Sequence, residues 1–259
     1  MDHDWIVPGW PAPGSVRAVC TTRQGGVSLP PYDSLNLGDH VGDDAGAVER
    51  NRAVLKAAIG SRPVFLRQVH GSAVAQLHAD SLDGTQADGC VVTQRGLACT
   101  IMVADCLPVL FADTAGRAVA AAHAGWRGLA GTGGIGVIEN VVHALWQALP
   151  STPSAAAART IAWLGPCIGP QAFEVGAEVR QAFVAQHPES SVLFRPHAPG
   201  KWLADLQGLA RLRLSALGIT QVYGNDGSPA WCSAGNPSRF FSHRRDRVSG
   251  RFAACVWLG

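Results

Sequence analysis

Hydrophobic positions recur with a helical period in four segments of the chain. The four predicted helices cover residues 45–59, 134–149, 176–187 and 204–217. Asp43 and Asp44 precede the first of them and Gly60 follows it, which are typical start and stop signals of a helix. The last segment ends in the same way, before Gly218. Periodicity and end signals therefore agree.

Short apolar runs of strand type lie between the predicted helices. They cover residues 17–22, 63–69, 73–77, 98–104, 107–112, 117–122, 160–164, 219–223 and 252–258. Strands outnumber helices and do not alternate strictly with them, which favours a mixed α/β (α+β) fold over a doubly wound sheet. We predict one domain over residues 1–259, with mixed β-sheets flanked by helices. Residues 151–158 shift in composition and are expected to form a surface loop.

The composition predicts a protein with a large buried core. Hydrophobic residues make up 47% of the 259 residues and charged residues 15%, which argues against a disordered chain. Lys and Arg number 21 and Asp and Glu number 19, for a net charge of +2. Because a nucleic-acid binder needs many cationic contacts, we expect no nucleic-acid partner, and any basic site must be local.

The sequence shows no sign of export or of a membrane anchor. Its start, Met1–Trp5, lacks the charged-then-apolar order of a signal peptide, and the apolar stretch Leu97–Ala112 is broken by Asp105. We therefore expect a cytoplasmic protein with no membrane partner. The seven cysteines have no regular spacing, so we expect core residues rather than a disulfide framework.

Three side chains that commonly bind metals stand where apolar runs end. His70 follows one run, Cys106 separates two others, and His123 precedes a glycine-containing segment. Two imidazoles and one thiolate suit Zn²⁺, with a fourth position left for water or substrate. Spacing alone does not establish the site, because a buried cysteine or a hydrogen-bonded histidine is the commoner fate.

Two glycine-containing segments are candidates for a pocket wall. In His123–Gly128, Trp126 offers a stacking face and Arg127 an anion fork, although a glycine turn with a core aromatic explains the same residues. Gly165–Pro170 either cradles an anion or forms a rigid turn, and we expect Cys167 to be structural.

The densest basic cluster lies near the end of the chain, from Phe240 to Arg247, and continues at Arg251. Such a run is usually a solvated loop. Its place between an aromatic pair and a final strand also suits a phosphate site.

Seven motifs, in order, resemble the YfiH/laccase-domain family, also called the polyphenol oxidase or peptidoglycan editing factor family. They are Thr21–Ser28, Ser34–Leu37, Gln68–Gly71, Ala104–Pro108, His123–Gly128, Gly165–Pro170 and Ser242–Asp246. The resemblance runs from about residue 17 to residue 258. It departs from the expected pattern at Arg247, where we expect a glycine.

The resemblance implies a fold related to bacterial toxin Cys-His deamidases and a zinc ion bound by His70, Cys106 and His123. It also implies a purine nucleoside phosphorylase that acts on adenosine, inosine and methylthioadenosine and that deaminates adenosine. Its partners would be a nucleoside and phosphate, and the chain a monomer or a weak homodimer. From side-chain chemistry, we predict that Cys106, His123, Arg127 and Asp105 are catalytic and that Trp126, Arg244 and Arg245 bind substrate.

Three other functions stay open. In a Cys-His hydrolase of muramoyl–amino acid peptidoglycan precursors, Cys106 would be the nucleophile, a histidine of the trio the base, and Asp105 its orienter. In a copper-dependent polyphenol oxidase the trio would bind copper with Met102 as axial ligand, but the nine histidines include no H-x-H pair for further coppers. A binding scaffold without catalysis would leave the fourth metal position unused.

Overall fold

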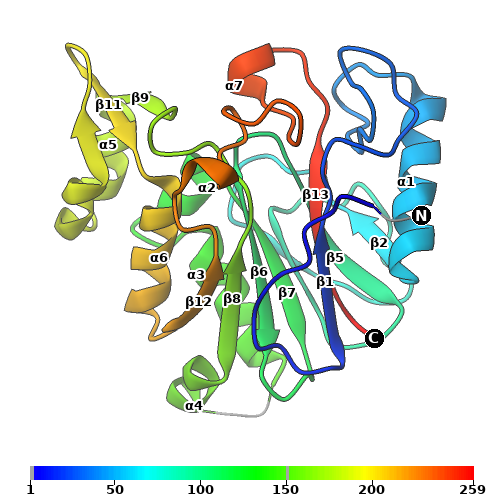
Figure 1. The fold of residues 1–259 in the computed structure, drawn as a ribbon. Helices are drawn as coiled ribbons and strands as arrows, with labels where there is room; N and C mark the ends of the chain where they lie inside the picture. Colours follow the sequence, from blue (N-terminus) through cyan, green and yellow to red (C-terminus); the bar gives the residue numbers. More distant parts are fainter. Residues whose placement is uncertain (1–2, 150–151) are drawn as a thin grey trace.

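Two β-sheets stack face to face in the computed structural model, which describes residues 3–149 and 152–259 (Figure 1). The four-stranded sheet has the order β1 (Val16–Cys20), β13 (Phe252–Leu258), β5 (Leu97–Val103) and β2 (Arg62–Phe65). The six-stranded sheet has the order β12 (Gln221–Gly224), β8 (Thr160–Leu164), β6 (Leu107–Asp113), β7 (Val119–Ala124), β4 (Gly89–Val92) and β3 (Val74–Gln76). Both sheets mix parallel and antiparallel pairs, as predicted.

The strands at the centre of the stack are buried on both faces. In β6, Leu110 and Ala112 face the other sheet, while Val109 and Phe111 pack under helices. This alternation follows the two-residue period of a strand. Because both faces are covered, β6 and β7 read as continuous apolar runs in the sequence.

Helices close the stack on its two outer faces. Helices α3 (Val137–Gln147) and α6 (Leu206–Ala216) cover the six-stranded sheet, and α1 (Ala45–Ile59) covers the four-stranded sheet. The Asp44 side chain caps α1 by accepting a hydrogen bond from the Ala47 N–H at 2.7 Å. Gly60 ends α1 at a φ of 66°. The result is an α/β/β/α arrangement.

A small antiparallel sheet projects from one end of the molecule (Figure 1). It has the order β10 (Phe194–Pro196), β11 (Lys201–Ala204) and β9 (Glu174–Gly176), and α5 (Ala177–Val184) packs against it. Helix α7 (His243–Asp246) and the segment before α1 lie at this same end of the molecule.

The four predicted helices and the nine predicted strand segments are confirmed, with ends shifted by a few residues. The prediction of a loop over 151–158 is wrong, because Pro153–Ala158 form helix α4. The Thr152 hydroxyl accepts a hydrogen bond from the Ala155 N–H at its start, and alanine favours helix; Ser151 lies outside the described residues. Short elements were not predicted: β4, the small sheet, helices α2 (Trp126–Ala130) and α7, and 3₁₀ turns at Pro188–Leu193 and Pro229–Trp231.

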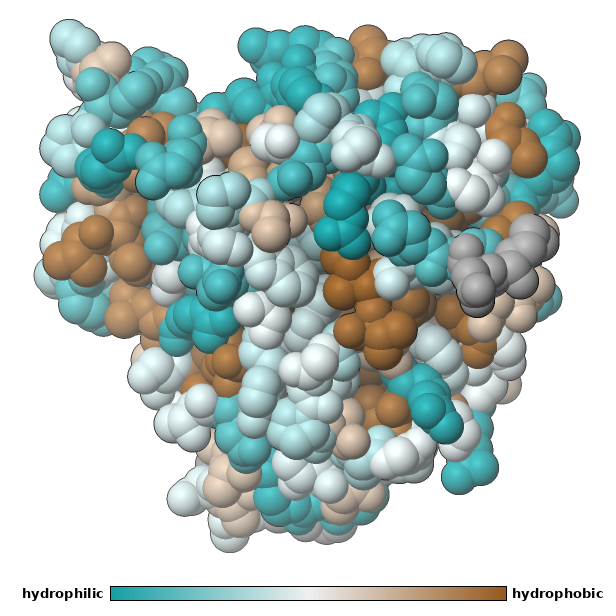
Figure 2. All heavy atoms as spheres, in the orientation of Figure 1, coloured by the Kyte–Doolittle hydropathy of each residue, from teal (hydrophilic) through white to brown (hydrophobic). Residues whose placement is uncertain are grey.

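Within the described residues, no helix combines the length and apolar character needed to span a membrane. The face in Figure 2 carries hydrophobic residues in separate patches among hydrophilic ones. All seven cysteines are free thiols, as expected.

Candidate metal centre and adjoining cavity

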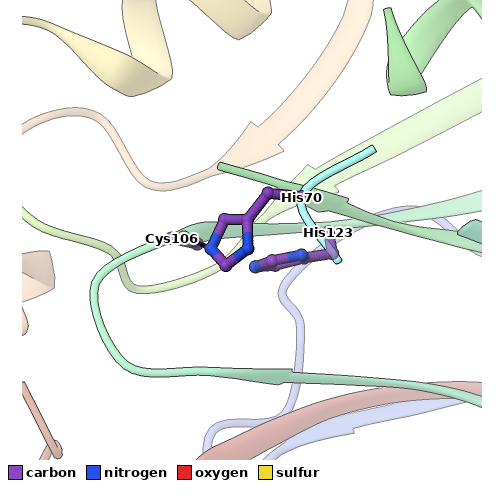
Figure 3. Close-up of side chains that lie close together, drawn as sticks. All are labelled: His70, Cys106 and His123. Carbon is purple, nitrogen blue, oxygen red and sulfur yellow. Dashed lines mark hydrogen bonds between the residues drawn. The ribbon is translucent and has the colours of Figure 1, made fainter. Parts of the chain in front are cut away.

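The three candidate ligands meet at one end of the two large sheets. His70 lies in the turn after β2, Cys106 between β5 and β6, and His123 near the end of β7. Their ligand atoms all lie within 4.8 Å of one another, and the Cys106 Sγ is 3.7 Å from the His70 Nε2. Figure 3 shows the three side chains close together, each from a different segment. The predicted convergence is confirmed.

A buried carboxylate, Asp88, positions two of the three ligands. It accepts a hydrogen bond from the His123 Nδ1–H at 2.8 Å. It also accepts the backbone N–H groups of Val69, His70 and Gly71, at 3.2, 2.9 and 2.8 Å. These bonds hold the turn in which His70 has a φ of 62°, uncommon outside glycine. Because Nδ1 of His123 is engaged, Nε2 remains for a metal.

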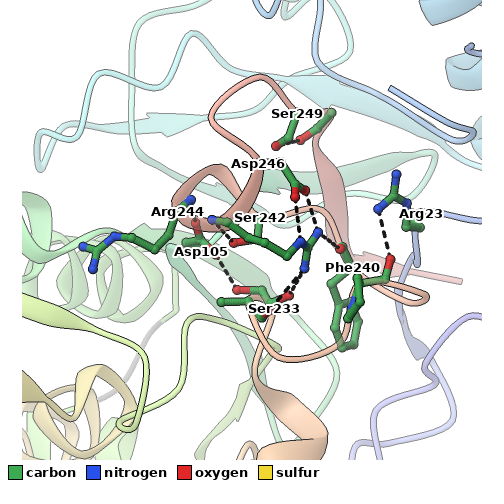
Figure 4. Close-up of polar contacts among 12 residues, drawn as sticks. Arg23, Asp105, Ser233, Phe240, Ser242, Arg244, Asp246 and Ser249 are labelled. Atoms are coloured by element: carbon green, nitrogen blue, oxygen red, sulfur yellow. Dashed lines mark hydrogen bonds and ion pairs between the residues drawn. The ribbon is translucent and has the colours of Figure 1, made fainter. Parts of the chain in front are cut away.

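A second strained turn presents Cys106. The preceding residue, Asp105, has a φ of 93°. Its carboxylate accepts hydrogen bonds from the Ser233 hydroxyl at 2.6 Å and from the Arg244 backbone N–H at 2.7 Å (Figure 4). Asp105 therefore fastens the Cys106 loop to α7. The carboxylate that orients a histidine is Asp88, in place of the predicted Asp105.

The side chains of the trio change each other's protonation. Burial raises the pKa of the Cys106 thiol, but the charge of His123 and hydrogen bonds from both histidines outweigh it and lower that pKa to about 6. Burial lowers the pKa of His123, but Cys106 and Asp88 raise it more, to about 9. Burial also opposes ionisation of Asp88, but the hydrogen bond and charge of His123, together with the backbone N–H groups of Gly71 and Val69, outweigh it and lower the pKa of Asp88. Without a metal, both shifts favour a thiolate on Cys106 beside an imidazolium on His123.

A cavity of about 380 Å³ opens beside the trio. This volume lies in the range of about 300–1,000 Å³ that small-molecule sites occupy. Trp126, Ile168 and Phe173 form apolar walls. The pocket-lip interpretation of Trp126 is thus supported by its place on the wall.

The charged lining of the cavity is mainly cationic. Apart from the trio, it includes the arginines Arg244, Arg247 and Arg251, and Asp105 is the one carboxylate among the described lining residues. The Arg244 guanidinium reaches across to β9 and donates to the backbone carbonyls of Ala172 and Glu174, at 3.5 and 3.0 Å. A cationic wall beside an aromatic one suits a ligand with an anionic part and a planar part.

Two of the predicted arginines, Arg127 and Arg245, are not among the residues that line the cavity. Arg127 is exposed and its guanidinium stacks 4.4 Å from the Trp126 ring centre, outside the described lining of the cavity. The Arg245 guanidinium donates to the Asp246 carboxylate and to the carbonyls of Ser233, Ala234 and Phe240. These contacts use all five of its N–H donors, so Arg245 holds the fold of this segment.

The loop Gly165–Pro170 is a rigid turn and does not cradle an anion. The backbone N–H groups of residues 165, 167, 168 and 169 donate to protein acceptors, and its two prolines have none. Cys167 is buried, and burial raises the pKa of its thiol, in accord with the expected structural role.

The donor set of the trio fits zinc. Zn–N bonds of about 2.0–2.1 Å and Zn–S bonds of about 2.3 Å place tetrahedral ligand atoms roughly 3.5 Å apart. The 3.7 Å between Cys106 Sγ and His70 Nε2 is close to that spacing. Over residues 3–149 and 152–259, this is the one group of three or more His, Cys, Asp or Glu side chains placed to hold an ion.

The sequence analysis did not identify Asp88. From the C-terminal basic cluster it selected Arg245, whereas Arg247 and Arg251 of that cluster line the cavity. The sequence offered one signal for Asp88, a carboxylate directly before a four-residue apolar run. His40, which also lines the cavity, carried no signal.

Comparison with known proteins shows similarity over nearly the whole chain. A family model described as "Multi-copper polyphenol oxidoreductase laccase" matches residues 17–259. The chain is 51% identical over 255 residues to a purine nucleoside phosphorylase of Pseudomonas aeruginosa, covering 98% of both proteins. It is 48% identical to "Purine nucleoside phosphorylase YfiH" of Escherichia coli, again covering 98% of both. The crystal structure of a Neisseria meningitidis protein superposes with a TM-score of 0.88 at 45% identity, covering 98% of this chain and 99% of that one.

Proposed function

Because the chain belongs to the YfiH family, which the multi-copper polyphenol oxidoreductase laccase model describes, we propose that it is a zinc-dependent purine nucleoside phosphorylase. The observation that carries the proposal is a single His₂Cys cluster at the wall of a cavity with aromatic and cationic sides. Relatives that share about half of its residues carry the phosphorylase name.

In phosphorolysis, a phosphate oxygen forms a bond to the ribose C1′ as the bond from C1′ to the purine nitrogen breaks. The electron pair of the broken bond leaves with the purine. Trp126 and Phe173 provide faces on which a purine ring packs, and the arginines of the cavity attract the phosphate. The substrates proposed are inosine, adenosine and methylthioadenosine, with deamination of adenosine as a second activity in the same cavity.

His70, Cys106 and His123 would hold the zinc ion. When bound, the ion supplies a Lewis acid that stabilises negative charge developing on the substrate. The protein residues around it fix its ligands: Asp88 holds His123 in one tautomer and Asp105 fastens the loop of Cys106. These contacts preorganise the site, so that little rearrangement is needed on binding.

Release of ribose 1-phosphate from inosine and phosphate tests this function. The zinc-loaded protein should turn over, and His123→Ala should abolish turnover. His143→Ala, on the exposed face of α3, is the matched control and should keep full activity. Undiminished turnover in His123→Ala would contradict the proposal.

A second candidate, a Cys-His amide hydrolase, is favoured by the low pKa of Cys106 beside His123. Chelation separates the two functions. A hydrolase with Cys106 as nucleophile should survive zinc removal and be inactivated by iodoacetamide, whereas a zinc phosphorylase should lose activity with its metal. Elemental analysis of protein purified without added metal distinguishes zinc from copper.

A further inference from the structure

The cavity arginines differ in how far their guanidinium groups are already engaged. Arg244 donates to the carbonyls of Ala172 and Glu174. Arg251 uses one guanidinium nitrogen for the carbonyls of Ser249 and Gly250, at 2.9 and 3.0 Å. Among the described residues, no carboxylate forms an ion pair with either Arg247 or Arg251, although eight arginine–carboxylate ion pairs occur elsewhere.

Arg247 occupies an unusual backbone position. Its φ of 63° and ψ of −59° belong to a γ-turn of the rarer, strained hand. The hydrogen bond that defines this turn runs from the Val248 N–H to the Asp246 carbonyl at 2.7 Å. Glycine adopts positive φ without strain, whereas other residues rarely do. An arginine at this position and on the cavity wall indicates that its side chain has a use.

Arg251 is half-buried beside the cavity. Its aliphatic stem packs over Gly38, where an added methyl group would lie 2.8 Å from the Arg251 Cγ. Burial lowers the pKa of its guanidinium, although nearby acidic groups oppose the shift. A half-buried cation that forms no ion pair with a carboxylate is stabilised by an anionic ligand. His40, from the segment before α1, lines the same cavity and adds a third donor.

We infer that Arg247 and Arg251, with His40, form the subsite that binds inorganic phosphate. This inference rests on the proposed function, because phosphate is the anionic substrate of phosphorolysis and the nucleosides are neutral. These residues take the phosphate-binding role that the sequence assigned to Arg127 and Arg245. The Arg127 guanidinium stacks on Trp126, and the Arg245 guanidinium holds the fold of its own segment. A phosphate bound beside Cys106 and His123 shares one cavity with the nucleoside, as attack at C1′ requires.

Direct binding tests the subsite independently of turnover. Inorganic phosphate is titrated calorimetrically into zinc-loaded wild type, Arg247→Gly and Arg247→Lys. Losing one charge-assisted contact should weaken phosphate binding about tenfold or more in Arg247→Gly, and Arg247→Lys should restore part of it. Because glycine relieves the positive φ, Arg247→Gly should melt no lower than wild type. Arg95→Gly, at an exposed arginine outside the cavity lining, is the matched control.

The outcomes separate this inference from the proposed function. If phosphate binding depends on Arg247 but no ribose 1-phosphate forms, the subsite is supported and the proposed phosphorylase activity is contradicted. If the enzyme turns over but Arg247→Gly changes neither the phosphate affinity nor the KM for phosphate, the subsite is contradicted. A 5′-phosphate of a nucleotide offers the same chemistry, so inosine 5′-monophosphate is titrated in parallel. Arg247-dependent binding of that nucleotide, without binding of inorganic phosphate, also overturns the subsite.

Discussion

Asp88 and His123 form a buried hydrogen bond of 2.8 Å, in which side chains with 0% and 4% of their surface exposed meet at the metal centre. The same carboxylate accepts the backbone N–H of His70. One residue that would not itself touch the metal thus sets the direction of two ligands. A buried carboxylate with that many donors is a fixed part of the site rather than a mobile acid.

Asp88→Asn should weaken zinc binding by about 10- to 100-fold, as the loss of such supporting contacts typically does. The amide keeps the shape of the side chain but provides one oxygen for donors that two carboxylate oxygens now serve. Competition with a chromophoric chelator measures the affinity. Asp113→Asn is the control, since Asp113 is equally buried but pairs with Arg117 and Arg159. Equal zinc affinity in Asp88→Asn and wild type would contradict this role.

Much of the layout follows from local sequence signals. Asp44 and Gly60 mark α1, and the uninterrupted apolar runs of β6 and β7 mark strands buried on both faces. The small sheet beside the cavity was missed because its three- and four-residue strands are too short to show a period.

The site was only partly predictable, for a different reason. His70, Cys106 and His123 stand at the ends of apolar runs, and the resemblance to a family identifies them together. Asp88 acts through contacts across 17 to 35 positions of sequence, and no local pattern encodes such contacts. The orientation of Arg245 likewise depends on carbonyls brought together only by the folded loop.

Alkylation of metal-free protein by iodoacetamide should proceed selectively at Cys106. Its lowered pKa means that the thiolate forms as pH rises through about 6, so the rate should climb around that pH and then level off. Burial raises the pKa of the thiols of Cys20, Cys99 and Cys167, which should stay unmodified in the folded protein. Mass spectrometry of tryptic peptides across a pH series measures both. Zinc should protect Cys106, and equal alkylation with and without zinc would argue that the ion does not bind there.

Arg245→Met should reduce stability and leave substrate binding nearly unchanged. The substitution removes hydrogen bonds from a guanidinium whose side chain is 21% exposed, and each such charged bond contributes roughly 1.5–3 kcal/mol. Urea unfolding should therefore give a lower midpoint, by an amount reduced where water replaces the lost contacts. Arg247→Met is the comparison, because Arg247 lines the cavity and belongs to the inferred phosphate subsite. A KM for phosphate that rises more in Arg245→Met than in Arg247→Met would support Arg245 as a phosphate ligand.

Gly125→Ala should disturb the metal centre through a single methyl group. Gly125 has a φ of −68°, which alanine adopts freely, so the backbone does not oppose the change. An added Cβ, however, would lie 2.9 Å from both the Cys106 Sγ and the His70 Cδ2. Both contacts are shorter than carbon–sulfur or carbon–carbon packing allows, so the methyl group must push the thiolate and the imidazole away from their present places.

The expected result is a zinc affinity lowered about tenfold or more, with turnover falling in parallel and the circular dichroism spectrum unchanged. Gly14→Ala is the matched control, because no atom lies within 4 Å of the position of its Cβ. Since the three atoms nearest to the added Cβ all belong to Cys106 and His70, wild-type zinc affinity in Gly125→Ala would show that the ion is not held between these two residues. Reduced affinity with normal turnover would instead separate metal binding from catalysis.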